Sequence, residues 1–300
     1  MFDLIVVGNL TIDCIIRKGT EPVFMPGGSA AYASLAAKRM GADVLVSSKV
    51  GPDFPKQYIS WLSRSGIDLA GLRRVKAPTT HFILKYDGEK RELQLKSSCE
   101  PISFKDIPAN IKTKGIHVGP VAGEISVETV TQLAELAENI SLDSQGFVRI
   151  FDDKGYAKTG KRLETKVLER VDVLKATEEE VKVAVGVKDV WKAMETVSEF
   201  APKIVIVTRG IAGAFILIEN SRYEVPAFKT SSIVDPTGAG DAFMGAFMAE
   251  YVQGKNPLWC AAVGSASASL VIEAIGPSFA GSKDDVLKRA EEVRGGIRKL

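Results

Sequence analysis

A glycine-rich segment late in the sequence has a carboxylate at each end. Residues 235–241 read Asp-Pro-Thr-Gly-Ala-Gly-Asp, and the apolar stretch that follows predicts a helix over residues 239–252. Glycines at the first turn of a helix leave the free backbone N–H groups open to a ligand, and the helix dipole attracts an anion there. The segment therefore predicts a site that could stabilise the negative charge of a phosphoryl group in transfer.

The second carboxylate of this segment, Asp241, falls inside the first turn of the predicted helix. A carboxylate at that place can accept the proton of an attacking hydroxyl group. Alternatively, Asp235, Thr237 and Asp241 could serve only to cap the helix, which Asp and Thr do well. Two glycines around a single alanine, with Asp at both ends, favour the chemical interpretation.

A second pair of glycines, Gly27 and Gly28, precedes an alanine-rich helix predicted over residues 29–40. Adjacent glycines let the backbone approach a ligand closely, although close helix packing would use them equally well. Asp13 follows the first predicted strand by five residues, where strand-end carboxylates meet ligands in open α/β sheets. Such a carboxylate would accept hydrogen bonds from the hydroxyls of a sugar or polyol.

Two other phosphate-binding patterns are weaker. Residues 155–162 fit the P-loop spacing until Arg162, which stands where that loop carries Ser or Thr. An ATPase built on Gly155–Lys161 is therefore a rival interpretation, and a solvated loop is the plainer one. No Gly-x-Gly-x-x-Gly follows the first strand, which argues against a Rossmann dinucleotide site.

The elements that must position these residues alternate along the chain. Runs such as residues 204–207, Ile-Val-Ile-Val, are apolar throughout, which is typical of parallel strands buried between helices. The expected strands are 4–8, 43–50, 115–119, 141–143, 171–176, 203–208 and 214–219. The expected helices are 29–40, 54–65, 126–138, 163–168, 177–185, 191–200, 239–252, 258–274 and 283–293.

One segment interrupts this alternation. Residues 79–85 and 91–96 have apolar side chains at every second position and are joined through Asp87-Gly88, a strong hairpin signal. We expect a small β appendage over residues 72–98, with residues 9–25 as a candidate contribution. It would serve either as a lid over a site or as an additional sheet edge. Residues 1–71 and 99–300 would form one α/β domain that binds nucleotide and substrate.

Composition excludes several classes of protein. The 300 residues include 39 Lys and Arg against 37 Asp and Glu, so the net charge of +2 excludes a strongly basic nucleic-acid binder and an acidic disordered chain. Three widely separated cysteines and two histidines exclude a disulfide framework and a histidine-rich metal centre. We expect a cytoplasmic protein with no membrane partner, and the scarcity of Asn and Gln suggests a thermophilic source.

Together, the two glycine segments resemble the signatures of the ribokinase (PfkB) family of carbohydrate and nucleoside kinases. Residues 27–41 resemble the first signature, and residues 235–241 match the second closely. The resemblance extends over nearly the whole chain, including Asp13, the hairpin, and the Thr208-Arg209-Gly210 turn after a strand. It implies an α/β fold: a ribokinase-like three-layer α/β/α sandwich with a mostly parallel central sheet and a small β lid.

The resemblance implies roles for the donor side of the site. Asp241 would be the catalytic base that activates a substrate hydroxyl for attack on the γ-phosphate of ATP. The amides of Gly238, Ala239 and Gly240 would form the anion hole, and Thr208, Gly210 and Thr237 would lie beside the nucleotide. Glu180 matches the family's Asn-x-x-Glu motif and would organise Mg²⁺ through water, although Thr177 replaces the Asn. Asp235 and Gly276 fall where many members hold a monovalent cation such as K⁺.

The acceptor side departs from ribokinase, because Tyr32 stands where ribokinases commonly carry Asn. Tyr32, Thr80 and residues 143–149 resemble the archaeal myo-inositol kinase branch more closely. The implied substrate-binding residues are Asp13, Gly27, Gly28, Tyr32, Thr80, Gln145 and Arg149. A cyclic polyol such as myo-inositol is the favoured acceptor. A nucleoside, another sugar, and a non-catalytic ligand-binding homologue are the alternatives, in either a monomer or a lid-mediated homodimer.

Overall fold

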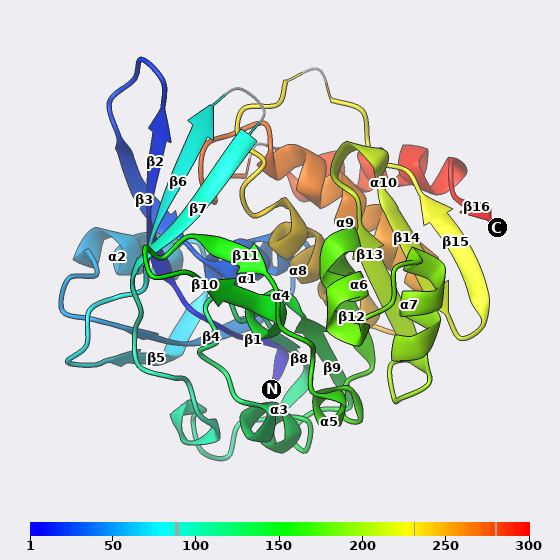
Figure 1. Cartoon of the computed structure of the whole chain (residues 1–300), viewed down its shortest axis with the longest axis horizontal. Helices are drawn as coiled ribbons and strands as arrows, with labels where there is room; N and C mark the ends of the chain where they lie inside the picture. The colour runs from blue at the N-terminus through cyan, green and yellow to red at the C-terminus, as the bar shows by residue number, and fades with distance from the viewer. Residues whose placement is uncertain (88–89, 231, 280) are drawn as a thin grey trace.

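A ten-stranded sheet forms the centre of the computed structural model, which describes every residue except 88–89, 231 and 280 (Figure 1). In spatial order its strands are β16 (Arg298–Lys299), β15 (Ser221–Val225), β14 (Ala214–Ile218), β13 (Ile204–Thr208), β12 (Val173–Thr177), β9 (Asn139–Asp143), β8 (Thr113–Val118), β1 (Phe2–Val7), β4 (Val44–Val50) and β5 (Asp68–Arg74). The strands from β13 to β5 are parallel to one another. The pairs β13–β14, β14–β15 and β15–β16 are antiparallel.

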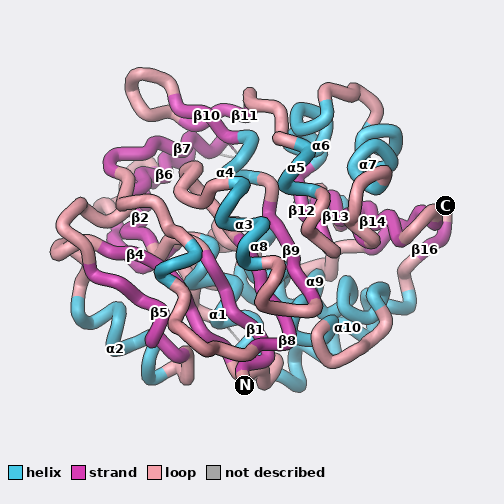
Figure 2. The backbone as a smooth tube through the Cα atoms, turned by 90° about the horizontal axis from the view of Figure 1, so that it is seen from below, coloured by secondary structure: helices cyan, strands magenta, loops and turns pink. Residues whose placement is uncertain are grey.

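Successive side chains of the central strands enter two different cores, because strand side chains alternate between the faces of a sheet. Leu4 and Val6 pack on one side, whereas Ile5 and Val7 pack on the other. The first side is covered by α1 (Ser29–Arg39), α2 (Lys56–Arg64), α8 (Ala239–Tyr251), α9 (Pro257–Val271) and α10 (Lys283–Gly295). The second is covered by α3 (Val127–Leu133), α5 (Thr165–Leu168), α6 (Glu178–Val185) and α7 (Val190–Ser198). In Figure 2, α1, α2 and α10 lie below the sheet, and α6 and α7 lie above it.

These three layers confirm the predicted α/β/α sandwich with a mostly parallel sheet. The last strand expected from the sequence was 214–219, and β15 was not expected because it is half-buried and lacks a clear apolar run. The helix predicted over residues 126–138 is shorter, since α3 ends at Leu133.

A second sheet of four strands stands apart from the central one (Figure 1). Its order is β3 (Val23–Gly27), β2 (Thr11–Arg17), β6 (His81–Asp87) and β7 (Lys90–Ser97), and we call it the lid sheet. The expected boundary at residue 72 is wrong, because Leu72 pairs with Ser48 in β4 and belongs to the central sheet. The predicted turn at Asp87-Gly88 lies partly outside the described residues.

The outer edge of the lid sheet is β3, where Phe24 is 58% exposed. An exposed edge strand can pair with a second chain. The expectation of a monomer or a lid-mediated homodimer stays a prediction.

The P-loop-like segment does not form a phosphate cradle. Gly155 lies in the turn between the short strands β10 (Arg149–Phe151) and β11 (Ala157–Thr159), and its carbonyl accepts a hydrogen bond from Leu95 of the lid sheet. No helix begins within residues 155–162, whereas a P-loop leads directly into one. The ATPase interpretation of this segment therefore fails.

Among the described residues, no helix combines the length and the apolar character that crossing a membrane requires.

Candidate active site

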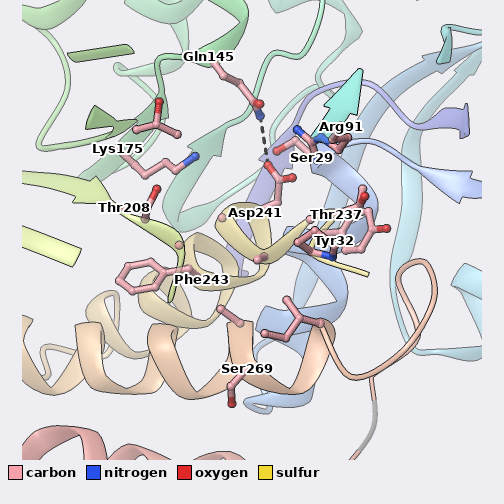
Figure 3. A pocket seen from close by; sticks show the side chains of 18 of the residues that line it. Ser29, Tyr32, Arg91, Gln145, Lys175, Thr208, Thr237, Asp241, Phe243 and Ser269 are labelled. Carbon is pink, nitrogen blue, oxygen red and sulfur yellow. Dashed lines mark hydrogen bonds between the residues drawn. The ribbon is translucent and has the colours of Figure 1, made fainter. Parts of the chain in front are cut away.

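A cavity of about 780 Å³ lies between the lid sheet, the carboxyl ends of the central strands and the start of α8. Its walls therefore come from three parts of the fold that are distant in sequence. Thr177 and Thr208 end β12 and β13 at this cavity, and Phe82, Leu84, Arg91 and Leu93 reach it from the lid sheet. Figure 3 shows part of this lining, with Asp241 near its centre.

The start of α8 presents backbone amides to this cavity. Gly238 is the N-cap residue, with a φ of 76°, and no side chain caps the helix. In the described part of the chain, the amides of Gly238, Gly240 and Asp241 have no hydrogen-bond acceptor. Ala239 differs from the expected anion hole, because its amide already donates to the Pro236 carbonyl at 3.4 Å. The open amides make this turn suitable for an anion.

Asp241 is half-buried beside these amides and lines the cavity. Gln145 Nε2 donates to its Oδ1 at 3.3 Å (Figure 3). Burial, together with the nearby negative charge of Asp143, raises the pKa of Asp241 to about 6. A carboxylate with that pKa is ionised at neutral pH and yet basic enough to accept a proton.

The carboxylate of Asp143 is paired with Lys175, a residue that the motif analysis did not single out. Asp143 and Lys175 lie opposite each other on β9 and β12, and Nζ donates to Oδ2 at 2.8 Å. Burial by itself lowers the pKa of Lys175, but the charges of Asp143, Glu180 and Asp241 outweigh burial and raise it. A lysine inside the otherwise apolar strand 173–176 is the signal that could have found it.

The lid side of the cavity contains Asp13, which is 5% exposed. Burial raises the pKa of Asp13 to about 7, although Thr11 donates a hydrogen bond to its Oδ1 at 2.6 Å. Gly27 does not line the cavity, but a Cβ at Gly27 would lie 2.0 Å from Oδ2 of Asp13. The glycine therefore makes room for the carboxylate.

Gln145 and Arg149 connect Asp241 by hydrogen bonds to the part of the cavity wall that contains Val121. They belong to the short helix α4 (Gln145–Val148) and the residue after it. Arg149 Nη2 donates to Gln145 Oε1 at 2.9 Å, and its Nη1 donates to the Val121 carbonyl at 2.7 Å. The same Gln145 side chain bonds Asp241, so both predicted residues lie at the cavity as expected.

Tyr32 lies under the α8 turn, and Gly28 lines the cavity close by. The Tyr32 hydroxyl is buried without a hydrogen-bond partner among the described residues, so it is free to bond a ligand. Thr80 is in a different place from the one expected. It does not line the cavity, and its Oγ1 is occupied by Asn9 Nδ2 at 2.8 Å and the Cys99 amide at 3.0 Å. Thr80 therefore supports the base of the lid sheet.

The residues expected beside the nucleotide line the part of the cavity near the carboxyl ends of β12 and β13 and the start of α8. Thr208, Gly210 and Thr237 all line it, as do Thr177 and Glu180. Thr177 is the N-cap of α6 and forms a capping box with Glu180, whose Oε2 accepts the Thr177 amide at 2.7 Å. Local helix capping therefore accounts for Thr177, and the other carboxylate oxygen of Glu180 remains available.

Two residues of the lid sheet form hydrogen bonds with the loop before α8. The Tyr86 hydroxyl donates to Asp235 Oδ1 at 2.7 Å and lies 2.7 Å from Thr237 Oγ1. Arg17 Nη2 donates to the Val234 carbonyl at 2.6 Å. None of these hydrogen bonds could be predicted from the sequence, because the partners are separated by 149 residues or more.

Asp235 and Gly276 lie behind the cavity and do not line it. Asp235 is 1% exposed, and its Oδ2 has no partner among the described residues. A Cβ at Gly276 would lie 2.5 Å from the Met25 sulfur of the lid sheet. The unpartnered, buried Oδ2 of Asp235 is suited to bind a cation. Gly276 instead lies against Met25 of the lid sheet, so its position is explained by that contact.

Comparison with known proteins agrees with this arrangement. Residues 1–284 match the model of the pfkB family carbohydrate kinases. The chain belongs to the pfkB family of carbohydrate kinases. Members of this family transfer a phosphoryl group to a hydroxyl group, and the chain is therefore a phosphotransferase.

Individual relatives differ in their acceptors. The chain is 31% identical to the cytidine kinase of Thermococcus kodakarensis over 91% of its own length and 97% of that protein. It is 30% identical to the inositol 3-kinase of Arabidopsis thaliana over 96% of its length and 81% of that protein. A solved pyrophosphate-dependent kinase of the ribokinase family superposes with a TM-score of 0.81 at 22% identity, covering 94% of this chain and 99% of that one.

The kinase is expected to depend on the Tyr86 contacts for closure of the lid. Tyr86→Phe removes hydrogen bonds to Asp235 and Thr237, and a bond to a charged group contributes about 1.5–3 kcal/mol. We expect a roughly tenfold rise in acceptor KM, with more ATP hydrolysis in the absence of acceptor because water enters. Steady-state kinetics would measure both. Tyr223→Phe is the matched control, since the Tyr223 hydroxyl makes no hydrogen bond to the described residues. Unchanged KM and hydrolysis in Tyr86→Phe would contradict the role.

The kinase is also expected to lose activity in acid. Asp241 and Asp13 have pKa values raised to about 6 and about 7. If Asp241 accepts the acceptor's proton and Asp13 accepts hydrogen bonds from the acceptor, both must be ionised. Log(kcat/KM) should therefore fall below pH 7 and approach a slope of about two below pH 6. A pH-rate profile that stays flat to pH 5 would contradict this assignment.

Proposed function

We propose that this kinase transfers the γ-phosphate of ATP to a hydroxyl of a small cyclic polyol such as myo-inositol. The observation that carries the proposal is the half-buried Asp241 carboxylate beside the open amides of the α8 turn, in one cavity with Asp13. An acceptor bound by Asp13 would place a hydroxyl between the lid sheet and that turn. Similarity to inositol 3-kinases supports the polyol.

In the proposed reaction, Asp241 accepts the proton of the acceptor hydroxyl as its oxygen attacks the γ-phosphorus. The bond from phosphorus to the bridging oxygen breaks, and its electron pair leaves with ADP. The amides of Gly238, Gly240 and Asp241 stabilise the charge on the transferred group. Gln145 holds the carboxylate of Asp241 in place, and the lid sheet excludes water that would otherwise hydrolyse ATP.

ATP is the proposed donor because the cavity continues past the phosphate turn. Beyond Thr208, it is lined by residues from η2 (Gly210–Ala212), from residues 227–230 and 233, and from α9 and its C-cap. The apolar residues of this part are Ile211, Ala227, Phe228, Ile233, Ala268 and Ile272. A nucleotide base requires such a surface, whereas a pyrophosphate donor does not.

The residues fit the metal ions that the family uses. Mg²⁺ in kinase sites is held by one or two carboxylates together with substrate phosphates and water. Glu180 has one carboxylate oxygen free at the cavity and would hold Mg²⁺ through water, where the ion would neutralise phosphate charge. The unpartnered Oδ2 of Asp235 would bind a monovalent cation such as K⁺.

A nucleoside is the second candidate acceptor, favoured by the underside of the lid. Phe82, Leu84 and Leu93 give this wall an apolar surface against which a base could pack. The similarity to a cytidine kinase supports the same alternative.

Release of ADP from the purified protein tests the function. We would supply ATP and Mg²⁺ with myo-inositol, with cytidine and other nucleosides, and with ribose and fructose. The proposal expects stimulated turnover with the polyol. Selective turnover with nucleosides would transfer the assignment to the second candidate, and no stimulation by any acceptor would contradict both. Replacing ATP by pyrophosphate tests the donor.

A further inference from the structure

Lys175 places an ammonium group in the interior with only part of its hydrogen-bonding capacity used. The residue is 4% exposed and yet lines the cavity. Among the described residues, Nζ has one acceptor, Oδ2 of Asp143 at 2.8 Å. An ammonium carries three N–H donors, so two of them have no protein acceptor. A buried donor without a partner is costly, which predicts that an oxygen of a ligand meets it.

The position of the ammonium indicates which oxygen that is. A Cβ at Gly240 would lie 2.9 Å from Lys175 Nζ, so the ammonium lies directly against the turn whose amides face the cavity. Figure 3 shows Lys175 extending toward the space in front of the Asp241 carboxylate. The ammonium and the positive end of α8 repel each other, and an anion that contacts both of them offsets that repulsion.

Resting on the proposed function, we propose that Lys175 is a catalytic residue whose ammonium contacts an oxygen of the phosphoryl group during its transfer. The phosphoryl group passes from ATP to the acceptor oxygen, ADP leaves with the electron pair of the broken bond, and the acceptor's proton goes to Asp241. Lys175 gains and loses no proton in this step. It supplies a fixed positive charge next to the amides of α8.

Neutralisation of Asp143 is the competing role for this lysine. Asp143 is fully buried, and its Oδ1 also accepts the Gln145 amide at 3.1 Å. Removal of Lys175 alone would leave an unpaired buried carboxylate, which is strongly destabilising. The single variant could therefore lose activity for a purely structural reason. Removal of both charges separates the two roles.

The decisive variant is Lys175→Met combined with Asp143→Asn. If the lysine only neutralises Asp143, the double variant keeps kcat within tenfold of the wild type, and that result would overturn the proposal. If the lysine contacts the phosphoryl group, kcat falls by more than tenfold. Thermal unfolding would check that the variant is folded. The matched control is Lys203→Met with Asp172→Asn, a pair 3.3 Å apart. These residues directly precede the amino ends of β12 and β13, at the end of the strands away from the cavity.

A binding measurement tests Lys175 independently of the acceptor. We would compare calorimetric affinities for ADP and for the β,γ-imido analogue of ATP, since only the analogue carries the third phosphoryl group. The double variant is expected to bind ADP within threefold of the wild type and the analogue at least tenfold more weakly. An unchanged ratio of the two affinities would overturn the proposal. Because no acceptor is needed, this result is distinguishable from failure of the acceptor panel.

Discussion

Asp241→Asn is expected to reduce kcat by about 10³-fold or more while the folded protein becomes more stable. The substitution removes the group that accepts the acceptor's proton, and general-base catalysis contributes about 10²–10⁴-fold. Asn preserves the size of the side chain and can still bond Gln145. Nucleotide affinity, measured by calorimetry, should therefore change little.

The stability gain follows from the raised pKa of Asp241. Its pKa of about 6 lies above the ordinary value of 3.8, so the folded state binds the proton more tightly than the unfolded chain does. The ionised carboxylate therefore destabilises the fold above pH 6 and does not below about pH 4. At about 1.4 kcal/mol per pKa unit, the penalty is roughly 2–3 kcal/mol. The thermal midpoint of Asp241→Asn should exceed the wild-type value at pH 7.5, and the difference should vanish at pH 4.

Asp285→Asn is the matched control for this substitution. Asp285 occupies the same position in the first turn of α10 as Asp241 does in α8, but it lies in an exposed capping box. Its pKa is lowered by hydrogen bonds from Ser282, so Asp285→Asn should leave kcat unchanged and should not raise the thermal midpoint. Near-normal turnover of Asp241→Asn would remove Asp241 from the role of base.

Gly238→Ala is expected to reduce kcat/KM by about 10²-fold, the effect of losing one well-placed anion-hole donor. Gly238 has a φ of 76°, and a Cβ there would lie 2.1 Å from the ring of Tyr32. The turn must shift to relieve this contact, and the amides shift with it. Kinetics with a saturating acceptor would measure the loss.

Gly254→Ala provides a control with the same backbone strain and no contact. Gly254 follows α8 with a φ of 75°, and a Cβ there would meet nothing within 4 Å. Both variants should lose about 1 kcal/mol of stability to the left-handed backbone conformation, but only Gly238→Ala should lose activity. Equal activity in the two variants would contradict the assignment of the α8 turn as the anion site.

Much of the fold could be predicted because its signals are local. The continuously apolar β13 and the capping residues of α6 act over a few neighbouring residues, so they are readable from the sequence. The glycines before α8 likewise predicted its open first turn, because that conformation depends on adjacent residues. β5 was not predicted, because most of its residues are exposed or half-buried and it therefore lacks an apolar pattern. Its strand conformation depends on pairing with β4, whose residues lie more than twenty positions earlier.

The sequence by itself determined the family signatures, the alternation of strands and helices, and Asp241 as a candidate base. The tertiary structure decided which side chains share the site with it. Lys175 meets Asp143 across two strands, Tyr86 reaches Asp235 from the lid sheet, and Thr80 is turned away into the base of that sheet. These contacts depend on the register of strands and the packing of layers. They join residues 32, 149 and 71 positions apart, a separation at which no local preference acts.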